Sequence, residues 1–319
     1  MLFQLEIQLI AVVVSIACSL VGSFLVLRRM SMTTDSITHT ILLGIVLGFF
    51  LTHDLNSPLL MIGAAAMGVI TVWLTELLHK SRLVSEDSSI GIVFPLLFSI
   101  AVILISRYAG HVHLDVDSVM LGELAFTPFD RMMIGDTDIG PRALYSALGL
   151  LLANTVFIIL LFKELKLVTF DPLLAAVMGF APALIHYALM FMVSLTAVGS
   201  FQAVGSILVV AFMIGPPATA YLMTDNVKRM LIYGAFIGTF NALVGFQVSS
   251  ALDVSIAGSI AGMTGLTFLV VFLVQPQRGL LRTLYRKRLQ KQEIDRMALV
   301  VHIAHHADSD VEAREASLV

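Results

Sequence analysis

Long apolar segments separated by short polar turns dominate the sequence. A transmembrane helix needs about 20 mostly apolar residues, and nine segments reach or approach that length. They cover residues 7–27, 33–51, 58–78, 88–105, 143–162, 182–198, 201–214, 230–250 and 254–274. The polar stretch 107–142 is too mixed to span a bilayer. The pattern predicts an all-α integral membrane protein, a polytopic bundle of about nine transmembrane helices.

The composition supports this class and excludes others. Of 319 residues, 58% are hydrophobic and only 13% are charged, whereas a soluble domain has about 25% charged residues. The single cysteine, Cys18, lies in an apolar segment, so neither a disulfide framework nor a thiolate metal cage is expected. With a net charge of −3 and no basic field, nucleic acid is not an expected partner. The expected location is the cell membrane, as a multi-pass protein in the lipid bilayer.

The basic residues predict the orientation of the chain. In a nine-span arrangement, five basic groups fall on one side of the membrane. They are Arg28/Arg29, Lys80/Arg82, Lys163/Lys166, Lys228/Arg229 and the basic residues of 278–288. Because Lys and Arg concentrate in cytoplasmic loops, we expect the N-terminus outside and the C-terminus in the cytoplasm. Two domains are expected: a transmembrane permease domain, 1–277, and a cytoplasmic basic, polar tail, 278–319.

The second apolar segment opens with an acid and a histidine, Asp35 and His39. Four residues apart on a helix, they share one face, and ionisable residues inside a membrane segment are functional candidates. Together they offer an oxygen and a nitrogen to a divalent metal. A structural alternative is open from position alone. Asp35 follows Arg29 by six residues, so it could be an acid favoured by the helix dipole, with His39 as a packing residue.

The rest of this segment has two distinct faces. Leu42, Val46 and Phe49 fall within about 40° of the acid–histidine pair on a helical projection. Gly44 and Gly48 fall nearly opposite, where they allow close packing on a neighbouring helix. We therefore expect a metal pathway on the first face, with the apolar column as a hydrophobic gate above the ligands.

Several motifs follow one another along the chain. They are GSFLVLRRM at 22–30 with DSITH at 35–39, SEDSSIGI at 85–92, LDVDSVMLGE at 114–123, FKELKLVTFDP at 162–172, FQAVGSILVV at 201–210 and PPATAYLMTD at 216–225. This ordered set, over about residues 7–285, resembles the permease family of ABC transporters that import manganese, zinc or iron(II). The segments 162–172 and 135–142 resemble the manganese branch of Gram-positive bacteria. Thr34, Thr38 and Thr40 stand where that family usually has Gly, Ser and Ala.

The resemblance implies a function and partners. Asp35 and His39 would contact the transported metal, most simply Mn²⁺, with Zn²⁺ or Fe²⁺ as alternatives, and no cofactor would be permanently bound. The chain would not be an enzyme, since ATP hydrolysis would belong to a separate cytoplasmic ABC ATPase. An extracytoplasmic metal-binding lipoprotein and a second permease copy, identical or related, would complete the importer.

The resemblance also implies a segment that couples the permease to the ATPase. Its expected form is a short, proline-broken helical segment after the seventh span, on the cytoplasmic side; the alternative is a plain connecting loop. The residues concerned are Pro216, Pro217, Ala218, Thr219, Ala220, Tyr221, Leu222, Thr224 and Asp225.

Two alternative functions and several other polar residues are also considered. One rival function is an ion-coupled secondary metal transporter, and a weaker one is a membrane metallohydrolase. Glu76 is expected to pair with Lys80 at i+4, and His186 to be a buried, hydrogen-bonded residue. Two His/Asp runs are either solvated segments or metal-binding patches. They comprise His111, His113, Asp115 and Asp117, and in the tail His302, His305, His306, Asp308 and Asp310.

Overall fold

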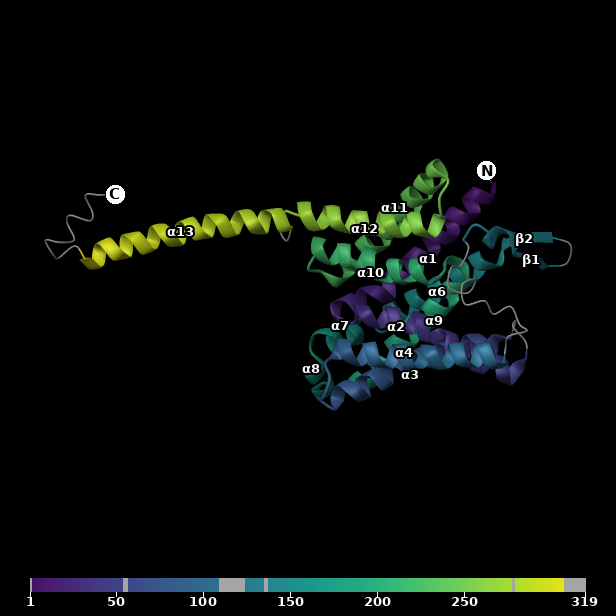
Figure 1. Cartoon of the computed structure of the whole chain (residues 1–319). Helices are drawn as coiled ribbons and strands as arrows, with labels where there is room; N and C mark the ends of the chain where they lie inside the picture. The colour runs from purple at the N-terminus through teal and green to yellow at the C-terminus, as the bar shows by residue number, and fades with distance from the viewer. Residues whose placement is uncertain (1, 54–56, 109–123, 135–136, 277–278, 307–319) are drawn as a thin grey trace. The chain divides into compact units, whose positions relative to one another are not determined.

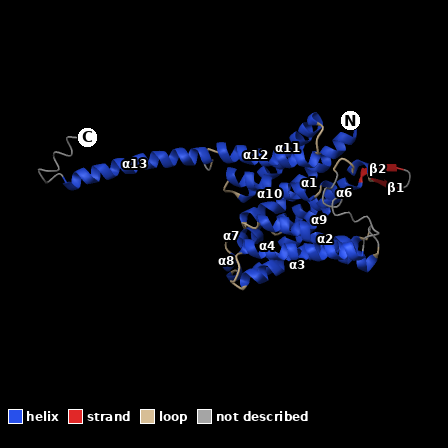
Figure 2. Cartoon of the chain, viewed as in Figure 1, coloured by secondary structure: helices blue, strands red, loops and turns tan. Residues whose placement is uncertain are grey.

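The chain is almost wholly helical. The computed structural model describes residues 2–53, 57–108, 124–134, 137–276 and 279–306, and Figure 2 shows one small strand pair among the helices. It divides into two compact units, Met1–Phe268 and Leu269–Val319. In the second unit, residues of the basic tail form the helix α13, Leu280–His306.

Nine helices among the described residues are long and apolar enough to cross a membrane, as predicted. They are α1 Leu2–Leu27, α2 Ser31–Thr52, α3 Pro58–Lys80, α4 Glu86–Tyr108, α6 Arg142–Leu160, α9 Pro182–Val204, α10 Ser206–Met223, α11 Val227–Leu252 and α12 Ile256–Val274. The chain is a multi-pass membrane protein.

Two groups of helices form the first unit (Figure 1). In one group, α1 packs against α6, α9, α10 and α11. In the other, α2 packs against α3 and α4, and α9 joins the groups because it contacts both α1 and α3. The core around α1 and α10 includes Phe24 and Phe212, which are fully buried.

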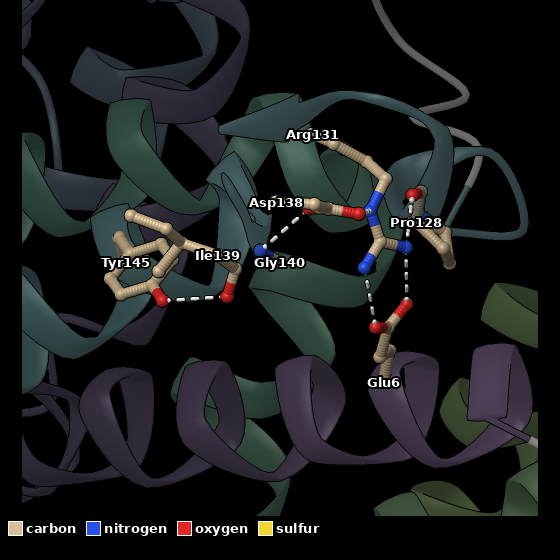
Figure 3. A network of polar contacts seen from close by, with 7 residues as sticks. All are labelled: Glu6, Pro128, Arg131, Asp138, Ile139, Gly140 and Tyr145. Atoms are coloured by element: carbon tan, nitrogen blue, oxygen red, sulfur yellow. Dashed lines mark hydrogen bonds and ion pairs between the residues drawn. The ribbon is translucent and has the colours of Figure 1, made fainter. Parts of the chain in front are cut away.

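One end of the first unit carries the small non-helical elements. The 3₁₀ turn η1, Thr127–Phe129, precedes the antiparallel strands β1, Arg131–Ile134, and β2, Thr137–Pro141. Arg131 ties this hairpin to the start of α1, because one of its terminal nitrogens lies 3.2 Å from Glu6 Oε1 and its Nε contacts Asp138 (Figure 3). In the same view, Tyr145 Oη donates to the Ile139 carbonyl.

The other end gathers basic residues, as the sequence predicted. Two short helices lie there, α7, Phe162–Phe170, and α8, Pro172–Val177. Arg28 Nε donates to Thr169 Oγ1 at 3.1 Å, and Lys228 Nζ lies 5.6 Å from the centre of the Phe162 ring. We call this the basic end; that it faces the cytoplasm stays a prediction from the positive-inside rule.

The seventh span differs from the prediction. We expected a helix over 201–214 that ends at Gly215-Pro216-Pro217; instead, α9 ends at Val204, Gly205 breaks the chain with φ +80°, and α10 runs through both prolines. Prolines lack an N–H, so the carbonyls of Phe212 and Met213 lose their helical donors. The Met213 carbonyl lies so close to Gly22 of α1 that a Cβ there would be 2.0 Å from it. Packing of α10 on α1 thus holds the helix together across the prolines.

Candidate metal site

Asp35 and His39 lie on one face of α2, as the sequence predicted. His39 Nε2 is 3.5 Å from Asp35 Oδ1, and the two side chains are 22% and 55% exposed, respectively. No third His, Cys, Asp or Glu joins them to form a metal-binding group within the described part of the chain. The pair therefore offers one oxygen and one nitrogen on an open face, and a complete coordination shell would need further ligands.

Aromatic side chains of α4 fix the orientation of the His39 ring. Its centroid is 5.1 Å from that of Phe94 and 5.9 Å from that of Phe98, which it meets edge to face. The gap beside the ring, bounded by Leu42 and Phe201, has a volume of only about 10 Å³, at the lower limit for a single water. The imidazole is thus packed on its flank, while Nε2 faces the Asp35 carboxylate.

The opposite face of α2 is locked against α3, as predicted. A Cβ at Gly44 would lie 2.4 Å from the Gly63 carbonyl oxygen, and one at Gly48 would lie 3.1 Å from the Leu60 Cα. One of the threonines that depart from the family pattern adds to this contact, because Thr71 Oγ1 donates to Thr40 Oγ1 at 2.8 Å. These contacts set the rotation of α2 and thereby the direction in which its acid–histidine pair points.

Thr38, another of these threonines, has its hydroxyl satisfied within the helix. Thr38 Oγ1 donates to the Asp35 carbonyl at 2.8 Å. Its hydroxyl is therefore not left unpaired in apolar surroundings. The helix itself begins regularly at Ser31, after Arg29 with φ +61°. The replacement of the usual Gly by Thr34 therefore does not disturb the first turn.

The predicted gate residues lie on the expected face but are packed. Leu42 and Val46 are 5% and 0% exposed, respectively, and they form a cluster with Val93 and Leu97 of α4. Phe49, one turn further along, is half-buried. In this structure α4 therefore covers the apolar column, while the acid–histidine pair beside it stays accessible.

The site lies near the basic end. Asp35 is about 6 Å along the axis from the first residue of α2, at 1.5 Å per residue. Thr33, two residues before it, lines the same cavity as Lys80 at the end of α3. The segment before α2 does not carry Asp35 to the middle of the bundle.

A second acid–histidine pair lies between helices. His186 Nε2 of α9 is 2.5 Å from Glu76 Oε1 of α3. Tyr187 Oη donates to Glu76 Oε2 at 2.9 Å, Lys80 Nζ lies 3.4 Å from the same oxygen, and an Arg28 terminal nitrogen is 3.0 Å from His186 Nδ1. The i+4 pairing of Glu76 with Lys80 is confirmed, but the bridge between α3 and α9 was not predicted. Two neighbouring cations make this pair a poor site for a divalent metal.

The coupling segment has a different structure from the one expected. It is no separate short helix, because Pro216 to Met223 continue α10, and four of its residues are buried between helices: Pro216, Pro217, Thr219 and Ala220. Among its other members, Tyr221 and Asp225 are exposed at the basic end.

Sequence reasoning missed a second exposed surface at that end. On α7 and α8, Phe170, Leu173 and Val177 are 60%, 79% and 85% exposed. Asp171 caps α8 by accepting from the Leu174 N–H at 2.9 Å. The Phe-Asp-Pro sequence that produces this cap lies between two expected spans, 143–162 and 182–198, and no exposed apolar surface was predicted there.

Some candidates fall outside the described residues. These are His111, His113, Asp115 and Asp117 of the long loop, and Asp308 and Asp310 of the tail.

The fold and the site define a class of protein, a polytopic helical membrane protein with a polar pair on one helix at the edge of a packed bundle. The chain belongs to the ABC 3 transport family, whose sequence model matches residues 3–275. This confirms the family resemblance that the motifs indicated and the fold class that the apolar segments predicted.

Individual relatives agree. The chain is 44% identical over 293 residues to the manganese transport system membrane protein MntD of Bacillus subtilis, covering 92% of this chain and 99% of the relative. It is 44% identical over 317 residues to the zinc transport system membrane protein TroD of Treponema pallidum, covering 98% and 86%. The solved structure of PsaBC from Streptococcus pneumoniae in complex with Fab matches with a TM-score of 0.71 and 29% identity, over 86% of this chain and 93% of that one.

Proposed function

We propose that this chain is the membrane permease subunit of an ATP-driven importer of a divalent transition metal. The observation that carries the proposal is the 44% identity to membrane proteins of both a manganese and a zinc transport system. Mn²⁺ is our first choice, because the Phe162–Pro172 segment resembles the manganese branch. A carboxylate and an imidazole also suit Zn²⁺ and Fe²⁺.

The metal passes Asp35 and His39. Their open face and short separation allow one cation to contact both side chains, with water or the same pair from a second permease copy as further ligands. A site with few protein ligands releases its ion readily, which suits transport better than storage.

Leu42, Val46 and Phe49 form the hydrophobic gate. The packing of Leu42 and Val46 on α4 excludes water beyond the ligand pair, so an ion cannot pass until the helices separate. Removing side-chain volume here, with Leu42→Ala and Val46→Ala together, should raise passive metal leak in the absence of ATP. Unchanged leak in proteoliposomes would exclude these residues as the seal.

A separate cytoplasmic ABC ATPase supplies the energy and docks at the basic end. One contact is the end of α10 and the residues after it, where Tyr221 and Asp225 are exposed and Leu222 and Thr224 are half-buried. The buried residues Pro216, Pro217, Thr219 and Ala220 would transmit movement through the α10–α1 packing, because rigid helices carry displacement between sites. The exposed apolar face of α7 and α8 is the second contact, since such a surface at a helix end suits a partner protein.

An extracytoplasmic metal-binding lipoprotein delivers the ion at the opposite end. The hairpin of β1 and β2, held to α1 by Arg131, gives that end a fixed surface. The permease itself carries out no reaction and binds no permanent cofactor.

Metal uptake tests the proposal. The chain is reconstituted with its ATPase and lipoprotein, and uptake of Mn²⁺, Zn²⁺ and Fe²⁺ is compared for wild type, Asp35→Asn and His39→Gln. We expect uptake of the transported ion to fall at least tenfold in both variants, with protein levels unchanged. Asp87→Asn, which removes an exposed carboxylate at the start of α4, serves as the control. Wild-type uptake by both site variants would refute the Asp35–His39 pathway.

The second candidate function, an ion-coupled secondary transporter, makes a different prediction. Transport by the purified chain alone, without an ATPase, would establish it. Dependence on both the ATPase and ATP would reject it.

A further inference from the structure

A cavity of about 580 Å³ opens at the basic end of the first unit; Thr33 of α2 lines it, but Asp35 and His39 do not. Its walls come from α1, α2, α3, α7, α8 and α9, so segments far apart in the sequence build it. Most of the wall is apolar, including Met30, Val72, Val168 and Pro172. The polar residues gather around Arg28, Lys80 and the Glu76–His186 pair.

Arg28 is the unusual member of this wall. Its guanidinium is hydrogen-bonded to two groups that are not carboxylates, Thr169 Oγ1 at 3.1 Å and His186 Nδ1 at 3.0 Å. One terminal nitrogen is buried without a hydrogen-bond partner, and no carboxylate forms an ion pair with Arg28 among the described residues. The nearby carboxylate of Glu76 is already engaged by His186, Tyr187 and Lys80.

A largely buried cation without a counter-ion is costly. Burial lowers the pKa of Arg28 to about 10, so the side chain is still charged at neutral pH. An anion in the cavity would offset this cost, and a guanidinium binds phosphate oxygens well because its donors form a planar fork.

Two further features make the cavity favourable to an anion. The first turn of α9 contributes Pro182 and Ala183 to the wall, and no side chain caps it, so its free N–H groups and the positive end of the helix dipole lie at the cavity. Lys80 adds a second cation at the rim, where its side chain is 71% exposed.

We propose that this cavity binds a phosphate group, with Arg28 and Lys80 as its charged contacts and the first turn of α9 beside it. An anionic phospholipid headgroup fits the apolar walls, which would meet the glycerol and upper acyl region. Basic pockets between membrane helices are suited to such headgroups. A soluble phosphate would use the same polar contacts and leave the apolar walls empty.

Such a ligand would tie together the end of α1, the end of α3 and the start of α9. Because α7 and α8 also line the cavity, its occupancy would stiffen the surface that we assign to the ATPase. The binding site itself does not depend on the transported metal or on the proposed function.

Thermal unfolding with defined lipids tests the inference. Purified full-length chain is melted in micelles that contain either phosphatidylglycerol or phosphatidylcholine, and separately with inorganic phosphate. We expect phosphatidylglycerol to raise Tm by several degrees above phosphatidylcholine. Arg28→Gln and Lys80→Gln should each remove at least half of that shift, whereas Arg82→Gln, an equal charge loss at an exposed residue outside the cavity, should keep it.

The two ligands distinguish a lipid headgroup from a soluble phosphate, and a second measurement covers variants that fold poorly. A shift with inorganic phosphate alone, lost in Arg28→Gln, would assign the site to a soluble phosphate. Native mass spectrometry counts phosphatidylglycerol retained per folded chain, so an unstable variant still gives an answer. An equal lipid shift in all variants, or no shift with either phosphatidylglycerol or phosphate, would overturn the proposal.

Discussion

Two acid–histidine pairs lie near the same end of the bundle and differ in how fully their polar atoms are used. Asp35 and His39 are 3.5 Å apart on one helix, and the carboxylate is 55% exposed. Glu76 and His186 are 2.5 Å apart on two helices, and Tyr187 and two cations take up their remaining atoms. The first pair presents metal-ligating atoms on an open face. In the second pair, these atoms are already bound by neighbouring side chains.

The difference teaches that donor type alone does not identify a metal site. Both pairs offer a carboxylate and an imidazole, the same chemistry for a divalent ion. What separates them is the neighbouring charge. Arg28 and Lys80 repel a cation from Glu76 and His186, whereas the rings of Phe94 and Phe98 flank His39. We therefore assign metal handling to the first pair and helix fastening to the second.

The largest expected effect is on metal binding. Removing both metal ligands with Asp35→Asn plus His39→Gln should weaken Mn²⁺ binding by the purified chain at least tenfold, since no third ligand joins them among the described residues. Glu76→Gln should change it less than twofold. Electron paramagnetic resonance of free Mn²⁺ measures both. A greater loss in Glu76→Gln than in the double variant would reverse the two assignments.

Protein stability should depend more on Glu76 and His186 than on Asp35. Glu76→Gln and His186→Gln each break a polar bridge between α3 and α9, so each should cost about 1–3 kcal/mol and lower Tm by several degrees. Asp35→Asn should leave Tm nearly unchanged, because its carboxylate bridges no other helix. Thermal unfolding in one detergent measures all three. A double-mutant cycle that yields no coupling between Glu76 and His186 would remove their fastening role.

The sequence was informative about the first pair and nearly silent about the second. An i,i+4 spacing is visible in a single helix, so Asp35, His39 and the Gly44 face could be predicted from periodicity alone. Glu76 and His186 are 110 residues apart, and only the packing of α9 on α3 brings them together. The apolar column was placed on the correct face, but its cover by α4 required the tertiary structure.

Local rules also misplaced one helix end. Gly215-Pro216-Pro217 satisfies every local signal for a helix stop, yet α10 continues because the freed Met213 carbonyl packs against Gly22. The break falls instead at Gly205, which takes a positive φ. Local propensity was overridden by contact with a helix about 190 residues earlier in the chain.

The smallest expected effect is on the hydrogen bond that Tyr187 donates to the Glu76–His186 pair. Tyr187→Phe removes one hydroxyl that donates to Glu76 Oε2 at 2.9 Å in a partly buried setting. A hydrogen bond to a charged acceptor is worth about 1.5–3 kcal/mol at most. Lys80 and His186 still hold the carboxylate, so we expect the free energy of unfolding to fall by about 1 kcal/mol.

The matched control is Tyr145→Phe, because the Tyr145 hydroxyl donates to the Ile139 carbonyl at an exposed position. That variant should lose less than about 0.5 kcal/mol, because water replaces the bond. Chemical unfolding of both variants measures the difference. Equal losses would mean that the Glu76 network is as solvated as the surface, which would remove the physical basis for treating its atoms as already bound.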